Sequence, residues 1–302
     1  MIRLTMSNNN SIASEIDAII ARAMAEYQQA KGGVNPFDEP VQEESVIRDE
    51  SEVIPEEIPA NSGSILVSEE TSRFSSAIWF DNVQSKAVTL AGLGGIGSYV
   101  AFLLSRLHIS SIYLYDDDTV EAGNMSGQLY SSSDVGMSKV NATAEMMSRY
   151  SNYYNFITYA ERFTDAKTPT PIMICGFDNM EARKTFFRSW KRLVASLPVT
   201  DRKTCLFIDG RLAAESFQVL CIRGDDTHSI SRYEQEFLFG DSEAEETICS
   251  YKQTTFMANM IGSVMVNLFV NFCANECDPL IPRDLPFFTE YSADTMYFKV
   301  VS

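Results

Sequence analysis

The sequence has few basic residues. Its 302 residues include 24 lysines and arginines against 41 aspartates and glutamates, which gives a formal net charge of -17 at pH 7. Nucleic-acid binding depends on clustered Lys and Arg side chains that neutralise phosphates. We therefore expect no nucleic-acid partner, although a local basic patch remains compatible with this charge.

An apolar leader is also lacking. The first thirty residues alternate apolar and polar side chains, so we expect no secretory signal peptide and a cytoplasmic protein. A later apolar stretch at 255–275 carries polar side chains at four-residue intervals, which favours a core helix with one contact face over a membrane span. These polar residues are Asn259, Ser263, Asn267 and Asn271.

Histidines and paired cysteines are scarce. Neither His108 nor His228 stands beside a recognisable nucleophile, and only Cys273 and Cys277 of the six cysteines are close in sequence. A structural zinc site usually needs four ligands, so we expect no structural zinc. The other cysteines lie mostly in apolar segments, where a thiol usually behaves as a small hydrophobic group in a reducing compartment.

Composition divides the chain into three parts. Residues 1–32 place apolar side chains at helical spacing, which predicts an N-terminal amphipathic helix able to dock a partner; a poorly ordered extension is the alternative. Residues 33–64 are acidic and rich in proline, with Arg48 as their one basic residue, and we predict an acidic disordered linker. We place the globular domain at residues 65–302.

Strand and helix patterns alternate through the globular part. We predict strands at 86–91, 111–115, 156–160, 171–175, 206–209 and 217–222, and helices at 72–84, 98–107, 138–150, 180–196 and 255–275. Gly210 and Arg211 are expected at the turn between the last two strands, and the run from Asp225 to His228 at a solvated turn. This order is typical of an α/β fold with a Rossmann-like, mostly parallel sheet and helices on both faces.

A glycine-rich turn follows the strand predicted at 86–91. In Gly92-Leu-Gly94-Gly-Ile-Gly97 the first glycine permits a tight turn, the second lets a phosphate approach the backbone, and the third lets helix and strand pack closely. The helix beginning near Gly95 directs free N–H groups at that phosphate. Asp116 follows nineteen residues after Gly97, where a ribose hydroxyl would be bound. The pattern predicts a nucleotide site, and an NAD-dependent oxidoreductase is the default interpretation.

Three segments after this turn favour another interpretation. The stretch 116–124, the turn Gly136-Met-Ser-Lys139 and the segment 176–183 together resemble the ThiF/MoeB/HesA family, the activating enzymes for ubiquitin and ubiquitin-like proteins. The resemblance implies a ThiF/MoeB-type adenylation domain that uses ATP and Mg²⁺ rather than NAD. It further implies adenylation of the C-terminal glycine of a small ubiquitin-like or sulfur-carrier protein, with release of pyrophosphate. A homodimer, or a heterodimer with a related chain, is also implied.

The resemblance gives roles to individual residues. Those implied at the nucleotide are Gly92, Gly94, Gly95 and Gly97 around the phosphates, Asp116 at the ribose, and Asp118, Asn124, Gln128 and Lys139 beside them. Asp178 would hold Mg²⁺. A lysine and a magnesium ion would neutralise the charge that builds when a carboxylate attacks the α-phosphate. Taken alone, Lys139 could be a surface lysine and Asp178 a helix cap.

Two expected arginines are missing. The family pattern Asn-x-x-Arg-Gln reads Asn124-Met-Ser-Gly127-Gln128 here, and an arginine expected near the domain start is Ser76. The first would contact the γ-phosphate, and the second would reach into a partner subunit's site. Arg183 and Arg211 are candidates for a replacement, although Arg211 could instead pair with Asp209 or Glu215. A catalytically degenerate scaffold or regulatory subunit that binds nucleotide is therefore the alternative to an active enzyme.

A cysteine near the start of the long apolar helix is the last candidate. The segment Ile248-Cys249-Ser-Tyr-Lys252 resembles the Cys-Thr-x-Lys segment around the thioester cysteine of the ubiquitin-type enzymes. Cys249 could take the acyl group from the adenylate as a thiolate, which Lys252 would favour. Many relatives have a cysteine nearby that forms no thioester. Cys249 could therefore be the nucleophile or a cysteine without a catalytic role, and both alternatives stay open.

Overall fold

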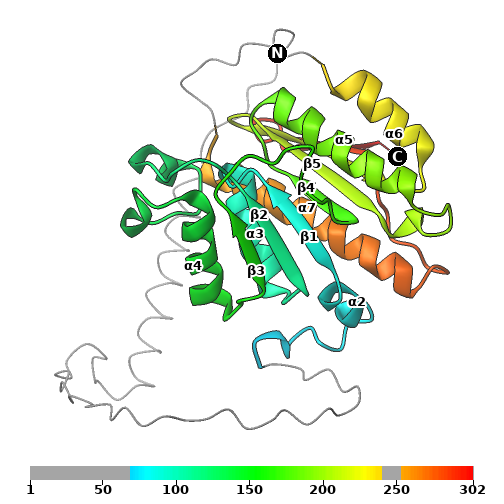
Figure 1. Ribbon diagram of the computed structural model, residues 1–302, viewed down its shortest axis with the longest axis horizontal. Coiled ribbons are helices and arrows are strands. Elements are labelled where there is room, and N and C mark those ends of the chain that lie inside the picture. Colours follow the sequence, from blue (N-terminus) through cyan, green and yellow to red (C-terminus); the bar gives the residue numbers. More distant parts are fainter. Residues whose placement is uncertain (1–68, 240–252, 302) are drawn as a thin grey trace, which may run out of the picture. The chain divides into compact units, whose positions relative to one another are not determined.

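The computed structural model describes residues 69–239 and 253–301 (Figure 1). Both ranges belong to the region predicted as the globular domain. The helix expected at 1–32, the linker expected at 33–64, and the candidate nucleophile Cys249 with Lys252 lie outside the described residues.

One eight-stranded sheet organises the described residues, with strand order β3-β2-β1-β4-β5-β6-β7-β8. The strands are β1 (Ala87–Ala91), β2 (Ser111–Tyr115), β3 (Phe156–Tyr159), β4 (Ile172–Cys175), β5 (Leu206–Leu212), β6 (Ser216–Arg223), β7 (Phe288–Ser292) and β8 (Tyr297–Val301). Pairs from β3 to β5 are parallel, and pairs from β5 to β8 are antiparallel. The expected α/β fold with a mostly parallel sheet is confirmed.

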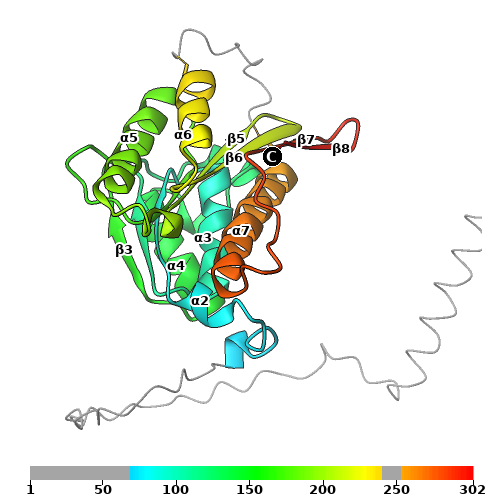
Figure 2. The same ribbon diagram turned by 90° about the vertical axis from the view of Figure 1, so that its right-hand side faces the viewer.

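Helices cover both faces of this sheet. The α-helices are α2 (Phe80–Gln84), α3 (Gly95–Arg106), α4 (Lys139–Ser151), α5 (Met180–Ser196), α6 (Thr227–Arg232) and α7 (Thr255–Cys277). Short turns of other helix types are η1 (Glu69–Thr71), η2 (Ala122–Ser126), η3 (Ser132–Asp134), η4 (Arg202–Thr204) and η5 (Tyr233–Phe237). Helices α3, α4 and α7 lie on one face, and α5 and α6 lie on the other (Figure 2).

Each face has its own hydrophobic core because the central strands are buried on both sides. Val88 and Leu90 of β1 pack with α3, α4 and α7 in one core. Met173 of β4 and Phe207 of β5 pack with α5 in the other core. Such two-sided burial explains why these strands read as continuous apolar runs.

Helix α7 is long and apolar enough to cross a membrane by length and composition alone, a test that core helices also pass. Its polar side chains Asn259, Ser263 and Asn267 are exposed, while the opposite side packs on α3 and β5. The approach is close: a Cβ on Gly210 of β5 would lie 2.6 Å from the Met265 sulfur. Helix α7 is therefore a core helix of this fold.

The helix expected at 72–84 is wrong over most of its length, since only α2 is helical there. Residues 72–79 instead form turns with backbone bonds three residues apart, such as Ala77 N to Phe74 O at 3.0 Å. The Ser72 hydroxyl donates to Glu69 O, and the Ser75 hydroxyl donates to Ser72 O. Serine side chains that compete for backbone groups in this way disfavour a continuous helix.

The turn expected at Gly210 and Arg211 is also wrong. Both residues belong to β5, where they pair with Val219 and Gln218, and the turn comes after Leu212. The run at Asp225 is only partly a turn, because Asp226 caps α6 by accepting a 3.0 Å hydrogen bond from Ser229 N. Strands β7 and β8 were not expected at all.

Candidate nucleotide site

The turns after β1 and β4 meet where the strand order reverses. Helix α3, after β1, and helix α5, after β4, cover opposite faces of the sheet (Figure 2). Open α/β sheets bind ligands in a crevice at such a reversal, so we expect the ligand here and call this edge the crevice. Gly92 has φ +82°, and a Cβ there would lie 2.7 Å from the Gly176 carbonyl carbon. A Cβ on Gly97 would lie 1.9 Å from Gly92 O. Glycines at 92, 97 and 176 are therefore required for this close backbone contact.

The N-terminus of α3 opens into the same crevice. Gly94 is its N-cap residue and, having no side chain, makes no side-chain cap hydrogen bond. The nearest atom to a Cβ on Gly94 would be Nε2 of Gln128, at 3.9 Å. Oε1 of the buried Gln128 has no hydrogen-bond partner within the described residues. The N–H groups of a first helical turn have no partner within their own helix, and together with the positive end of the helix dipole they make this a suitable place for a phosphate.

Asp116 lies against the glycine turn. Its Oδ2 accepts a 2.7 Å hydrogen bond from Leu93 N, and its Oδ1 accepts a 2.9 Å bond from Asp118 N. Burial raises the pKa of this carboxyl, and the two backbone N–H donors lower it by less. The Tyr130 hydroxyl fixes the other side of Leu93 by donating to its carbonyl oxygen at 2.6 Å. The structure thus places Asp116 at the glycine turn, and its role at a ribose stays a prediction.

Lys139 is buried rather than being an ordinary surface lysine. Its ammonium group lies 2.8 Å from Asp118 Oδ2, with side-chain exposures of 9% for Lys139 and 65% for Asp118. The backbone N–H of Lys139 also donates to Asp118 O at 2.9 Å. This ion pair holds the Lys139 ammonium group near Asp116. Its partner carboxylate, that of Asp118, is exposed to solvent.

Asn124 and Asp178 are placed differently from each other. The Asn124 side chain accepts a 2.8 Å hydrogen bond from Glu121 N, so it stabilises η2. Asp178 is exposed just after the Gly176 turn, and the cap of α5 is Asn179, whose side chain accepts a 2.8 Å bond from Ala182 N. The helix-cap alternative for Asp178 is therefore wrong, and its carboxylate is accessible at the crevice.

Asp209 binds both arginines that were candidates to replace the missing ones. Arg183 donates to Asp209 Oδ1 and to the carbonyl of Phe177, while Arg211 Nε lies 2.9 Å from Asp209 Oδ2. Burial lowers the pKa of Arg183, but the negative charge of Asp209 raises it by a larger amount, so the net pKa is raised. Sequence reasoning named Asp209 only as a partner of Arg211 and missed the shared cluster.

Gln253 is a candidate site residue that the sequence patterns did not indicate. It comes just before α7, and its side chain lies beside both Gly95 and Gly127. No spacing rule connects positions so far apart in the sequence, so only the tertiary contact reveals it. Ser76, at the other missing arginine, is exposed in the turn segment before α2.

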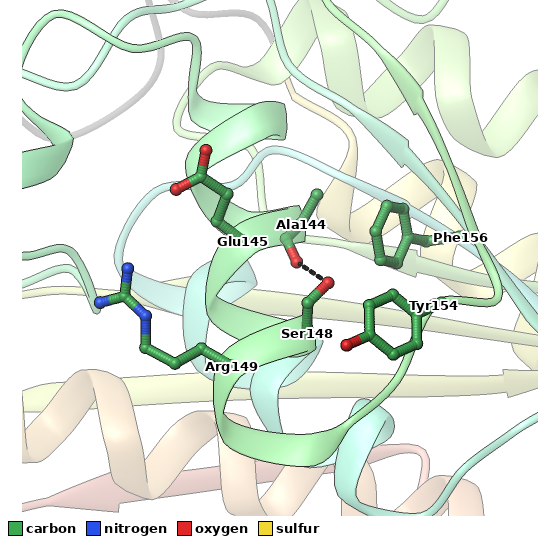
Figure 3. A pocket seen from close by; sticks show the side chains of 6 residues that line it. All are labelled: Ala144, Glu145, Ser148, Arg149, Tyr154 and Phe156. Carbon is green, nitrogen blue, oxygen red and sulfur yellow. Dashed lines mark hydrogen bonds between the residues drawn. The ribbon is translucent and has the colours of Figure 1, made fainter. Parts of the chain in front are cut away.

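A separate pocket of about 380 Å³ lies between α4 and the start of β3 (Figure 3). Glu145 and Arg149 of α4 and the rings of Tyr154 and Phe156 line it, and the Ser148 hydroxyl donates to Ala144 O. None of the site residues expected from the sequence lines this pocket. The predicted site residues around the glycine turn thus lie outside this pocket.

The crevice combines groups that suit a polyphosphate. It has a helix N-terminus, the buried Lys139, and acidic side chains that fit a divalent cation, since carboxylates are preferred ligands of Mg²⁺. Within the described residues, Asp116, Asp117 and Asp118 bring carboxylate oxygens within 4.8 Å of one another. Asp178 adds an accessible carboxylate from the turn after β4.

Comparisons with known proteins give the same picture of the fold. The model of the ThiF family matches residues 73–301. Ubiquitin-like modifier-activating enzyme 5 of Drosophila mojavensis is 29% identical over 187 residues, which cover 56% of this chain and 44% of that protein. The enzyme of the same name from Drosophila melanogaster is 32% identical over 121 residues, or 34% and 30% of the two chains. The chain thus spans less than half the length of these relatives.

Solved structures resemble the chain at low sequence identity. A crystal structure of selenomethionine PaaA has a TM-score of 0.59 and 15% identity, covering 96% of this chain and 84% of that one. Escherichia coli MccB with ATP has a TM-score of 0.54 and 15% identity, covering 78% and 71%. At such identities these likenesses concern the fold alone.

Proposed function

The chain belongs to the ThiF family, and we propose that it is an ATP-dependent adenylyltransferase acting on the C-terminal carboxylate of a small ubiquitin-like or sulfur-carrier protein. The observation that carries the proposal is the buried Lys139 beside the glycine turn and the α3 N-terminus. The names of the relatives and the ATP bound to MccB support it. A cytoplasmic location and a dimer are parts of the same proposal.

In the proposed reaction, an oxygen of the carrier carboxylate attacks the α-phosphate, and the bond to the β-phosphate breaks to release pyrophosphate. Donors at the α3 N-terminus orient the phosphates, and Lys139 stabilises the charge that develops on them. Asp116 binds the ribose hydroxyls. Asp178 would hold Mg²⁺, which when bound would offset repulsion between the carboxylate and the phosphates.

Lys139 changes partner in this proposal. In the structure its ammonium group is paired with Asp118, whose side chain is largely exposed. A bound phosphate carries more negative charge than a carboxylate. It would either share the Lys139 ammonium group with Asp118 or displace Asp118 from it. Because the lysine is buried, its interaction with phosphate is screened less by water than that of a surface lysine.

Cys249 would extend the reaction by one step. Its thiolate would attack the acyl carbon of the adenylate, forming a thioester and releasing AMP. This part rests on the sequence segment alone. A carrier band that migrates with the protein, disappears with a reducing thiol and is lost in Cys249→Ser would support it; an unchanged band in Cys249→Ser would contradict it.

Gly127 favours a second candidate, a nucleotide-binding scaffold or regulatory subunit. A charge-assisted contact to a transferring phosphoryl group is missing at that position, and such contacts supply several kcal/mol in many enzymes (~3–4 kcal/mol). Tight ATP binding without AMP formation would favour this candidate over the enzyme.

Exchange of labelled pyrophosphate into ATP in the presence of candidate small carrier proteins tests the proposal. We expect exchange with a matching carrier, and losses of about a hundredfold or more in Asp178→Ala and Lys139→Ala. Asp201→Ala and Lys203→Ala are matched controls, because both residues are exposed at η4 before β5, at the opposite end of the strand. Equal losses in controls and site variants, or exchange unaffected by Asp178→Ala, would contradict the proposal.

A further inference from the structure

The Gln253 side chain lies across the proposed phosphate position. A Cβ on Gly127 would be 2.7 Å from its Cγ and 3.3 Å from its Nε2. A Cβ on Gly95 would be 1.9 Å from its Oε1 and 3.4 Å from its Nε2. The side chain thus passes Gly127 and ends beside the first residue of α3. Both neighbours must be glycine for the amide to occupy this place.

The backbone on the C-terminal side of Gln253 is anchored by two hydrogen bonds. The Thr254 hydroxyl donates to Ala214 O at 3.1 Å, in the turn between β5 and β6. The Thr255 hydroxyl donates to Ser126 O at 2.6 Å, the residue immediately before Gly127. These bonds attach the start of α7 to the loop that contains Gly127. Gln253 is therefore held at the crevice by the fold.

An amide at this position has a clear partner in a nucleotide complex. Phosphate at the α3 N-terminus would lie next to Gly95, within reach of the Nε2 donor, while Oε1 could turn away by rotation of the amide. An arginine was expected from the sequence at position 127, where a side chain would overlap Gln253 as it lies in the structure. The two features are complementary, because the missing side chain leaves the room that Gln253 fills.

We propose that Gln253 binds the β- or γ-phosphate of ATP through its side-chain amide and takes the position of the missing arginine. This inference rests on the proposed nucleotide site. A neutral donor binds phosphate less strongly than a guanidinium. The site should therefore bind ATP without the full charge compensation that an arginine would give, and the amide should contribute to ATP affinity but not to AMP affinity.

Calorimetric titration of the full chain with ATP and with AMP tests this role. We expect Gln253→Ala to weaken ATP binding by about threefold to tenfold, the effect of one neutral hydrogen bond, with AMP binding unchanged. Gln253→Glu keeps the shape but places a carboxylate beside phosphate, so it should weaken ATP binding more than Gln253→Ala. Gln218→Ala is the matched control, because Gln218 binds Glu290 between β6 and β7.

Gly127→Ala provides an independent check through coupling. Its added Cβ would push against the Gln253 side chain, so ATP affinity should fall in the native background and stay unchanged when added to Gln253→Ala. Gly123→Ala is the control, since a Cβ there meets nothing within 4 Å. Urea unfolding of every variant verifies that each is folded.

Three results would overturn the inference: unchanged or tighter ATP binding in Gln253→Ala, equal losses for ATP and AMP, or additive effects of Gly127→Ala and Gln253→Ala. In all three the wild-type protein still binds ATP, so the proposed nucleotide site survives. A wild-type chain that binds neither nucleotide would instead remove the proposed function and this inference together.

Discussion

Replacement of Asp209 should destabilise the fold strongly. Its side chain is 0% exposed and receives Arg183, Arg211 and the Tyr233 hydroxyl, the last two at 2.9 Å. Asp209→Asn keeps the shape but leaves two partly or fully buried guanidinium groups without their countercharge. Removing one partner of a buried ion pair costs about 3–5 kcal/mol. In a domain of this size each kcal/mol lowers Tm by about 2–4 °C.

The assay is urea unfolding followed by circular dichroism, with Asp225→Asn as the matched control. Asp225 pairs with Arg223 at 3.0 Å on the surface, where side-chain exposures are 36% and 47%. Exposed pairs contribute no more than about 1 kcal/mol. A loss for Asp209→Asn as small as that for Asp225→Asn would refute the reasoning that this cluster is a buried, mutually compensating network.

Two further predictions concern the glycine turn and a helix cap. Gly97→Ala should lower stability by about 1–3 kcal/mol and abolish the ATP-induced thermal shift, because its Cβ would lie 1.9 Å from Gly92 O; Gly123→Ala should change neither quantity. Asp226→Ala should cost about 1 kcal/mol at pH 7. Burial raises the pKa of Asp226, but its hydrogen bonds to Ser229 lower it by a larger amount, so the net pKa lies below the ordinary value of 3.8. The stabilisation from this cap is therefore fully present above pH 3.8 and is lost as the pH falls through the lowered pKa. Urea unfolding at pH 7 and in acid should show the difference between wild type and Asp226→Ala shrinking; a constant difference would contradict the assignment.

Sequence patterns predicted the parallel half of the sheet well. Apolar runs such as Ala87–Ala91 and Ile172–Cys175 are strands buried on both faces, and such runs followed by helices are typical of parallel sheets. Patterns failed where local competition or long-range pairing decides the structure. Serine hydroxyls at 72 and 75 bind backbone carbonyls where residues 72–79 form turns instead of a helix. The edge strand β8 is stabilised by its pairing with β7.

The sequence by itself determined the glycine turn, the acidic residue after β2 and the order of motifs that identified the family. Those features are local: a tight turn needs Gly92 at positive φ, and a helix start supplies phosphate donors over a few residues. Site roles beyond this geometry stay predictions.

Only the tertiary structure decided which side chains share the crevice. The sequence alone left open whether Lys139 is a surface lysine, and the structure shows it buried beside Asp118. The sequence also left Arg183 and Arg211 as candidates to replace the missing arginines, and the structure shows both paired with Asp209. Gln253 reaches Gly127 across 126 positions of sequence because α7 is tied to the 122–126 loop. Such contacts depend on how distant elements pack, and that information is not contained in local spacing.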